Sequence, residues 1–315
     1  MSVLSRCPWL LMLLLGCAWV HAQPILEDTV AFDPKGVEIK WAITNEQSPS
    51  NLKIYRSIPR KFSPETVSNL LSLAGLSEND RNSDSITRDH AAFGFTSKQQ
   101  NRHWIRFSPI TGSVELSSPP LDPYGKEGDL VPSKSEVIQR GSNLFATLFN
   151  IGTNQWAFRD SRPMLSCTGG SGEWTEPKTK RRVKCVTHRG VFFNRAIDGC
   201  LVMDQDSGAE ADFVEYGKLH QLKLEWPSVE PVRELPRASL DYCKQTLAQG
   251  GAYWSPYEIY SPKRIVIQRI DYCYLSQRKR GEQKIYSPLI RLSGTAYDSR
   301  TNAPVYFFCR MAEEK

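Results

Sequence analysis

The spacing of apolar residues changes period along this chain and predicts three helices separated by strand-rich segments. Residues 63–65 supply an N-cap serine, a proline at the first helical position and an acid in the first turn, so a helix is expected there, ending at Gly75. Residues 133–136 form a Ser-x-x-Glu capping box at the start of a second helix. A third helix opens at residues 236–239 and stops at the two glycines 250–251.

Runs of alternating apolar and polar residues around these helices predict the strands. They cover residues 37–41, 52–55, 91–96, 103–107, 113–116, 189–197, 200–203, 211–214, 219–226, 264–270, 272–275, 285–286, 289–292 and 305–308. The Asp198-Gly199 pair predicts a hairpin turn between two of these strands. In the segment 219–226, leucines alternate with Lys223 and Glu225, so one face of that sheet is expected to meet water.

Helices that alternate with hairpin strands indicate an α+β fold. We expect repeated α-β-β(-β) units, PepSY-like in pattern, in which antiparallel sheets carry helices packed on one face. Residues 23–120 would form a first α/β lobe, and residues 121–315 a second lobe with two such units and the six cysteines of the mature chain. Residues 1–22 would be removed as a signal peptide.

The order of these units resembles a known group of bacterial proteins. The matching segments are residues 63–76 with 103–116, residues 133–148 with 191–226, and residues 236–250 with 265–308, each a helix-like segment followed by strand-like segments. Each pair looks like a PepSY-type module, and several such modules behind an export signal resemble the YycH- and YycI-type extracytoplasmic regulators of bacterial sensor kinases. The resemblance implies a non-catalytic protein that binds another exported or membrane protein.

The N-terminus has the composition of a secretory signal. Arg6 is the only charged residue among the first 26, and residues 9–20 are nearly all apolar. This run has about 12 residues, whereas a membrane span needs about 20. Small residues before Gln23 predict cleavage there, an exported protein that is periplasmic or secreted, and no transmembrane span afterwards. Residues 14–17 also resemble a bacterial lipobox, so a ligand-binding lipoprotein anchored at Cys17 stays open as an alternative.

An even number of cysteines in an exported chain favours disulfides. Six remain after the signal peptide: Cys167, Cys185, Cys200, Cys243, Cys273 and Cys309. The pairing we expect first is Cys167–Cys185, because these two residues flank a glycine-rich and charged segment. The second is Cys273–Cys309, because both lie in strand-like segments near the C-terminus. Cys200–Cys243 is then the remaining pair. There is no Cys-x-x-Cys pair and no histidine at metal-ligand spacing, so no zinc site is expected.

Charge and catalytic motifs narrow the function further. The net charge of +6 is mild and lacks the concentrated excess expected of a nucleic-acid-binding protein. His188 lies three residues after Cys185, but a Cys-His nucleophile needs a thiol outside a disulfide. His103 and His220 are expected to be structural or surface residues and not ligands or bases. Residues 168–172 lack the spacing of a nucleophile elbow and the lysine of a phosphate loop, so they predict a flexible hairpin tip. No catalytic residue and no cofactor is predicted.

Acidic residues gather between positions 204 and 212. Alternating carboxylates there could surround a calcium ion, and the candidate ligands are Asp204, Asp206, Glu210 and Asp212. The glycine of the segment is one place early for a helix–loop–helix calcium site, and strands surround it, so a solvated turn is expected. The alternative is an exported hydrolase whose acid pair is Asp204 and Asp206.

The strongest run of charge covers residues 178–184 and forms a candidate partner-binding loop. Its members are Trp174, Lys178, Lys180, Arg181, Arg182 and Lys184. Arg189 and Arg195 could extend it into a basic face that attracts an acidic protein or an anionic envelope surface. A merely solvated loop is the alternative. Together these features predict an exported, non-catalytic protein-binding or regulatory protein of the bacterial cell envelope, with another envelope or secreted protein as its partner.

Overall fold

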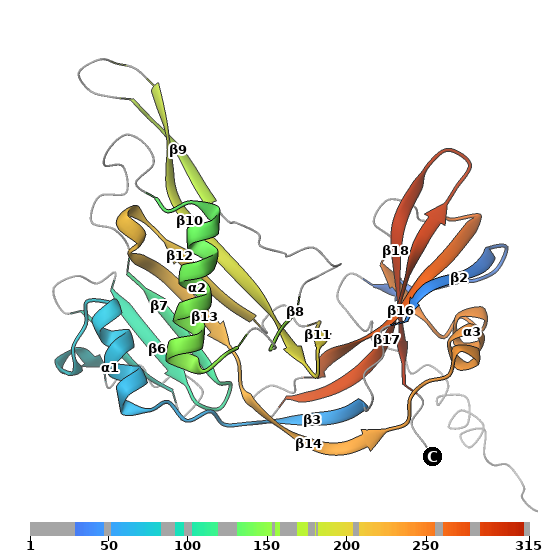
Figure 1. Cartoon of the computed structure of the whole chain (residues 1–315), viewed down its shortest axis with the longest axis horizontal. Coiled ribbons are helices and arrows are strands. Elements are labelled where there is room, and N and C mark those ends of the chain that lie inside the picture. Colours follow the sequence, from blue (N-terminus) through green and yellow to red (C-terminus); the bar gives the residue numbers. More distant parts are fainter. Residues whose placement is uncertain are drawn as a thin grey trace, which may run out of the picture.

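Strands dominate this protein. The computed structural model describes residues 29–46, 52–82, 92–97, 103–118, 131–152, 155–157, 169–175, 180, 182–203, 208–255, 261–277 and 284–311. In these ranges the chain forms one connected mixed sheet of 18 strands and three α-helices (Figure 1). The sheet has two regions, sheet A and sheet B, each with its own apolar core. Cys17 and the predicted signal peptide lie outside the described residues.

Sheet B is antiparallel and carries two helices on one face. Its strands, in spatial order, are β4 (Arg81–Asn82), β5 (Phe93–Thr96), β6 (Trp104–Ser108), β7 (Ser113–Ser117), β13 (Leu219–Glu225), β12 (Gly208–Phe213), β10 (Arg182–Ile197) and β9 (Gly169–Thr175), with β8 (Trp156–Ala157) beside the end of β10. Helices α1 (Pro64–Leu73) and α2 (Lys134–Phe149) share its core. Short 3-10 turns, η1 (Glu78–Asp80) and η5 (Glu215–Gly217), join its elements.

Sheet A is built on the long hairpin of β16 (Arg264–Gln277) and β17 (Ile285–Tyr297). The outer half of this hairpin is flanked by β2 (Glu38–Glu46) on one side and by β18 (Asn302–Arg310), β15 (Tyr253–Ser255) and β1 (Val30–Ala31) on the other. The inner half is flanked by β11 (Cys200–Val202) on one side and by β3 (Leu52–Ile58) and β14 (Ser228–Leu235) on the other. Helix α3 (Leu240–Ala248) packs against β18, where the Tyr242 hydroxyl donates to the Arg310 carbonyl at 3.0 Å.

The three predicted helices are confirmed, and each begins with the expected serine chemistry. The Ser63 hydroxyl accepts from the Thr66 amide at 3.0 Å. Ser133 and Glu136 form the reciprocal capping box, in which the Ser133 amide donates to the Glu136 carboxylate at 2.7 Å. These bonds satisfy backbone N–H groups that a helix cannot pair internally. Local sequence therefore fixed where each helix starts.

The predicted α+β class, in which repeated units fold as antiparallel sheets under their own helices, is wrong. Strands β2 and β3 precede the first helix but pair with β16 and β17 near the C-terminus, and β7 pairs with β13. Strands β2 and β11 also run parallel to β16. Alternation in a sequence records which face of a strand is buried, but not which strand lies beside it. The predicted lobe boundary at residues 120–121 lies outside the described residues, and these strand pairs cross it.

Strand β10 joins the two regions. It pairs with β9 and β12 in sheet B, and its last residues turn at Asp198-Gly199 to pair with β11 in sheet A. Both turn residues have positive φ, 51° and 74°, which is the conformation that an Asp-Gly hairpin turn supplies. The predicted hairpin is confirmed. The Tyr55 hydroxyl, from β3, donates to the Asp198 carboxylate and holds the turn against sheet A.

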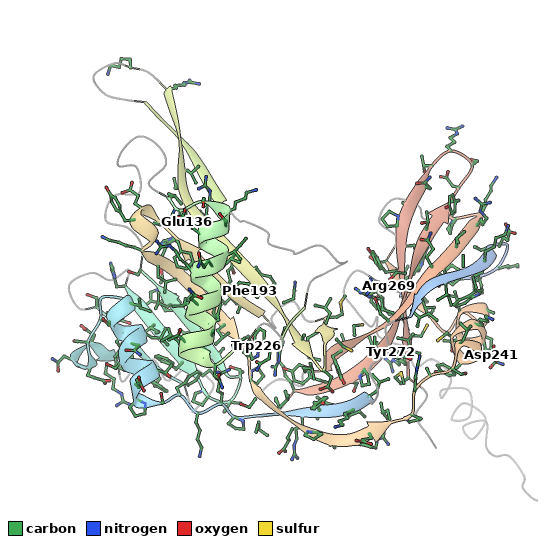
Figure 2. The ribbon with its side chains drawn as sticks, viewed as in Figure 1. Glu136, Phe193, Trp226, Asp241, Arg269 and Tyr272 are labelled. Atoms are coloured by element: carbon green, nitrogen blue, oxygen red, sulfur yellow. The ribbon has the colours of Figure 1, made fainter. Side chains whose placement is uncertain are left out.

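Charged and aromatic side chains fill the junction between sheets A and B, and all of them are buried except Arg60, which is half-buried. We define this junction as Arg60, Arg195, Glu225, Trp226, Lys284 and Tyr286. The guanidinium of Arg195, only 4% exposed, lies 5.4 Å from the ring centre of Trp226 and 5.3 Å from that of Tyr286. The Lys284 ammonium lies 2.5 Å from the Glu225 carboxylate, and both residues are buried. Arg60 donates to the main-chain oxygens of Trp226, which is labelled in Figure 2, and of Phe149, the last residue of α2. Polar contacts thus set how the two sheets meet.

Candidate functional site

A two-stranded ribbon extends beyond the rest of sheet B, at the upper left of Figure 1. Its pairing runs from Arg182 opposite Thr175 to Arg189 opposite Gly169. Strand β12 joins β10 only from Arg189 onward, so the ribbon has no third strand among the described residues. We call the described residues 169–175, 180 and 182–189 the β9–β10 ribbon. Because it stands away from the rest of the sheet, another molecule can approach it.

The base of the ribbon is fixed to sheet B. Arg189 donates from Nη1 to the carbonyls of Val131 at 3.2 Å and Pro132 at 2.7 Å, just before α2 begins. Figure 2 marks that end of α2 with Glu136. The His188 ring lies 6.1 Å from the ring of His220 on β13. A two-stranded hairpin is marginally stable by itself, so these contacts are needed to hold the ribbon in its direction.

Positive charge concentrates in the sequence of the ribbon and of the segment that joins its strands. Residues 169–189 contain six basic and two acidic side chains, which gives +4 (6 − 2) of the chain's net +6. The six basic residues are Lys178, Lys180, Arg181, Arg182, Lys184 and Arg189. Lys180, two residues before β10, and Arg182, the first residue of β10, are exposed. Exposed positive charge at this position attracts negatively charged surfaces.

The structure describes only some of the predicted loop residues, and it places Arg195, which was expected beside them, elsewhere. Lys178, Arg181 and the side chains of Trp174 and Lys184 lie outside the described residues. Arg195, which we expected to extend the basic face, lies instead in the buried junction. Val191 and Phe193 are buried on the same strand, and alternation from them places residue 195 on the core face. That signal was present in the sequence.

The glycine-rich segment is a strand and not a hairpin tip. Residues 169–172 belong to β9, where Gly172 lies opposite Cys185 and Gly170 opposite His188. The prediction of a flexible tip there is wrong. Hydrogen bonds to β10 hold a segment whose own strand propensity is low, which is why the sequence alone did not reveal it.

The structure describes only the second part of the acidic segment. Asp204 and Asp206 lie outside the described residues, whereas Glu210 and Asp212 are in β12 and not in the expected turn. Burial and the charge of Asp212 raise the pKa of Glu210, while Lys223 on the neighbouring strand lowers it. Among the described residues, no group of three or more histidine, cysteine or acidic side chains could hold a metal ion.

Two histidines serve as hydrogen-bonding bridges between elements of sheet B. His103 Nδ1 lies 3.0 Å from the carbonyl of Ala74, just after α1, and 3.1 Å from the Ser118 hydroxyl. His220 Nδ1 lies 3.3 Å from the carbonyl of Ser118. These contacts give both rings the structural role that the sequence predicted.

The described cysteines are buried and form no disulfide among themselves: Cys200, Cys243, Cys273 and Cys309. The register aligns Cys273 with Leu289 but Cys309 with Ile290, so their side chains point to opposite faces with β17 between them. The predicted Cys273–Cys309 bond is therefore wrong, and Cys200–Cys243 is not formed either. In β9, Gly172 and not Cys167 lies opposite Cys185, and Cys167 is outside the described residues.

Burial should make these thiols slow to react. Loss of hydration raises the pKa of Cys200, Cys273 and Cys309 to about 12. At pH 8 the thiolate fraction is then lower by about a thousandfold than for an unperturbed thiol. We expect iodoacetamide to leave these three residues unmodified in the folded protein and to alkylate them after unfolding, as measured by peptide mass spectrometry. Rapid alkylation of the native protein, or a peptide with Cys273 bonded to Cys309, would contradict this.

Comparisons with known proteins give no family. The sequence matches no protein-family model and no curated protein. The solved structures include a similar one, an uncharacterized protein from Eubacterium rectale, with a TM-score of 0.44 and 9% identity over 86% of each chain. A likeness of this degree carries no argument about function. None of the helices in the described ranges has the length and apolar character needed to cross a membrane.

Proposed function

We propose that this protein is an exported, non-catalytic binding protein of the bacterial cell envelope, and that its β9–β10 ribbon docks on an acidic surface of another envelope or secreted protein. The observation that carries the proposal is the ribbon itself, because it projects from sheet B with Lys180 and Arg182 exposed, and residues 169–189 hold +4 of the chain's net charge of +6. The signal-like residues 1–22 support export. The resemblance to YycH- and YycI-type regulators points to the same class of role.

The shape of the ribbon favours binding over a purely structural role. Charges that only keep a protein soluble are of both signs and interspersed. Residues 169–189 instead hold six basic and two acidic side chains, next to the anchor that Arg189 provides. Complementary charge mainly speeds encounter and selects partners, so the affinity of the complex should fall as salt concentration rises. Lys180 and Arg182 are exposed, so the charge is changed at these two residues.

Reversing the charge of the ribbon should weaken binding. We expect Lys180→Glu with Arg182→Glu to reduce capture of the partner from the envelope fraction of the native host by about tenfold, since each exposed interfacial charge contributes about 0.5–1 kcal/mol. The readout is quantitative mass spectrometry of proteins retained by the immobilised full chain. The matched control is Lys263→Glu with Arg300→Glu, an equal change of charge on exposed residues that flank the strands of sheet A.

The control separates a specific ribbon from a general effect of charge. If both double variants lose the partner equally, the net charge of the protein and not the ribbon governs binding. Vesicles that contain phosphatidylglycerol provide the second comparison. If the wild-type protein binds these vesicles and retains no protein, the ribbon acts on the anionic envelope surface and the proposed protein partner is wrong.

A further inference from the structure

The two long edge strands of sheet A differ in how well they are protected against pairing. Strand β14, at one edge, has Pro231, a register shift between Pro231 and Arg233, and cross-strand contacts such as Arg56 Nε to Glu230 at 3.0 Å. Proline, bulges and charge are the usual means by which an edge strand avoids adding another strand. Strand β2, at the opposite edge, pairs only with β16 among the described residues.

The first part of β2 has neither a proline nor a bulge. From Glu38 to Trp41 its register with β16 is regular, and the irregularity follows after Trp41. Ile39 and Trp41 pack partly buried against the core of sheet A, while Glu38 and Lys40 lie on the solvent face, 56% and 55% exposed, and form an ion pair at 3.1 Å. Because these two charges are opposite in sign, the strand can accept a further strand that places an opposite charge beside each of them.

Main-chain groups of Ile39 are directed to the open edge. The Glu38 amide donates to the Lys263 carbonyl at 2.9 Å, on the β16 side. Successive residues of a strand direct their N–H and C=O groups to opposite edges, so those of Ile39 and Trp41 face outward. An antiparallel strand centred on Ile39 would pair with these groups.

We propose that β2 is the interface of a homodimer, in which the β2 strands of two copies pair antiparallel about a two-fold axis at Ile39. This register sets Glu38 opposite Lys40 of the other copy, twice, and Val37 opposite Trp41, twice. The apolar sides then stay on the same face of a continuous sheet. A centre at Lys40 would instead place two lysines opposite each other, and a centre at Glu38 would oppose two carboxylates.

Charge reversal tests this register because the two residues should compensate each other. Glu38→Lys and Lys40→Glu each create like-charge pairs across the axis, and each should weaken dimerisation by about tenfold. The double variant E38K/K40E restores opposite charges and should dimerise like the wild type. An equimolar mixture of the two single variants should form a heterodimer, since two lysines then face two glutamates.

The measurement is sedimentation velocity of the full chain as its native host processes it, between about 10 and about 200 µM, the range suited to a small interface. Both side chains are exposed, so equal thermal melting curves will show that the variants fold. Concentration-dependent dimers that follow the charge pattern support the proposal. A wild-type protein that is monomeric throughout, or a dimer that neither single variant weakens, overturns it.

Discussion

Replacing Glu225 with glutamine is expected to lower the free energy of unfolding by about 3–5 kcal/mol. The carboxylate lies against the Lys284 ammonium, and its charge also counters the effect of burial, which lowers the pKa of Arg195. Lys284 and Arg195 are each 4% exposed, so neither can recover the lost interaction from water. Urea unfolding followed by circular dichroism measures the change.

The size of this effect should depend on burial, and two further variants test that. Glu230 on β14 forms an ion pair with Arg56 on β3, and both side chains are exposed, so Glu230→Gln should cost less than about 1 kcal/mol. In the double variant E225Q/K284M both charges are removed, and it should be no less stable than E225Q alone. If E225Q and E230Q have equal effects, the junction does not hold the two sheets together electrostatically.

Replacing Gly294 with alanine is expected to destabilise the protein by about 3 kcal/mol or more. An added Cβ would lie 2.1 Å from the carbonyl oxygen of Val266 and 3.0 Å from Cα of Ile267. These atoms belong to the backbone of β16, at the register shift between Ile267 and Arg269, and cannot move aside without breaking the central hairpin of sheet A.

Gly199→Ala is the matched control for that glycine. Its φ is +74°, and nothing lies within 4 Å of an added Cβ, so the cost is conformational and should be about 1 kcal/mol. The same urea titration compares the two variants. Equal stabilities would show that sheet A adjusts to the methyl group at position 294.

Local structure was predictable because its causes are local. Serine caps, the Asp198-Gly199 turn and the alternation along β13 each depend on residues a few positions apart, and all three are confirmed. Glu225 is the exception on β13: it was expected to face water, but it is buried by its ion pair with Lys284.

The arrangement of strands was not predictable from these patterns. Parallel pairing of Glu38 with Arg264 joins segments at opposite ends of the chain, and β14 was not anticipated at all. Most residues of β14 are exposed, so it shows no apolar alternation. The pairing of β7 with β13 places α1 and α2 on one sheet, a consequence of register and not of either helix.

The candidate site was predictable as a run of charge but not as a shape. The sequence showed the basic residues between Trp174 and Lys184, whereas the projecting ribbon depends on where β12 begins to pair with β10. In the sequence, Arg189, which anchors the ribbon, is one of six basic residues between positions 169 and 189. Hydrogen bonds to Val131 and Pro132 distinguish it, and these connect segments far apart in the chain.

Site-specific photo-crosslinking in living cells of the native host tests the proposed docking role most directly. A benzophenone amino acid is placed at Lys180 on the ribbon or at Lys263, which is also exposed but lies just before β16 of sheet A. We expect the Lys180 position to give one discrete envelope or secreted protein whose crosslink is lost when Arg182 is also reversed to glutamate. The Lys263 position should give no protein other than a second copy of this chain, since Lys263 lies beside Glu38. Equal crosslinks from both positions, or no protein from the ribbon, would contradict the account.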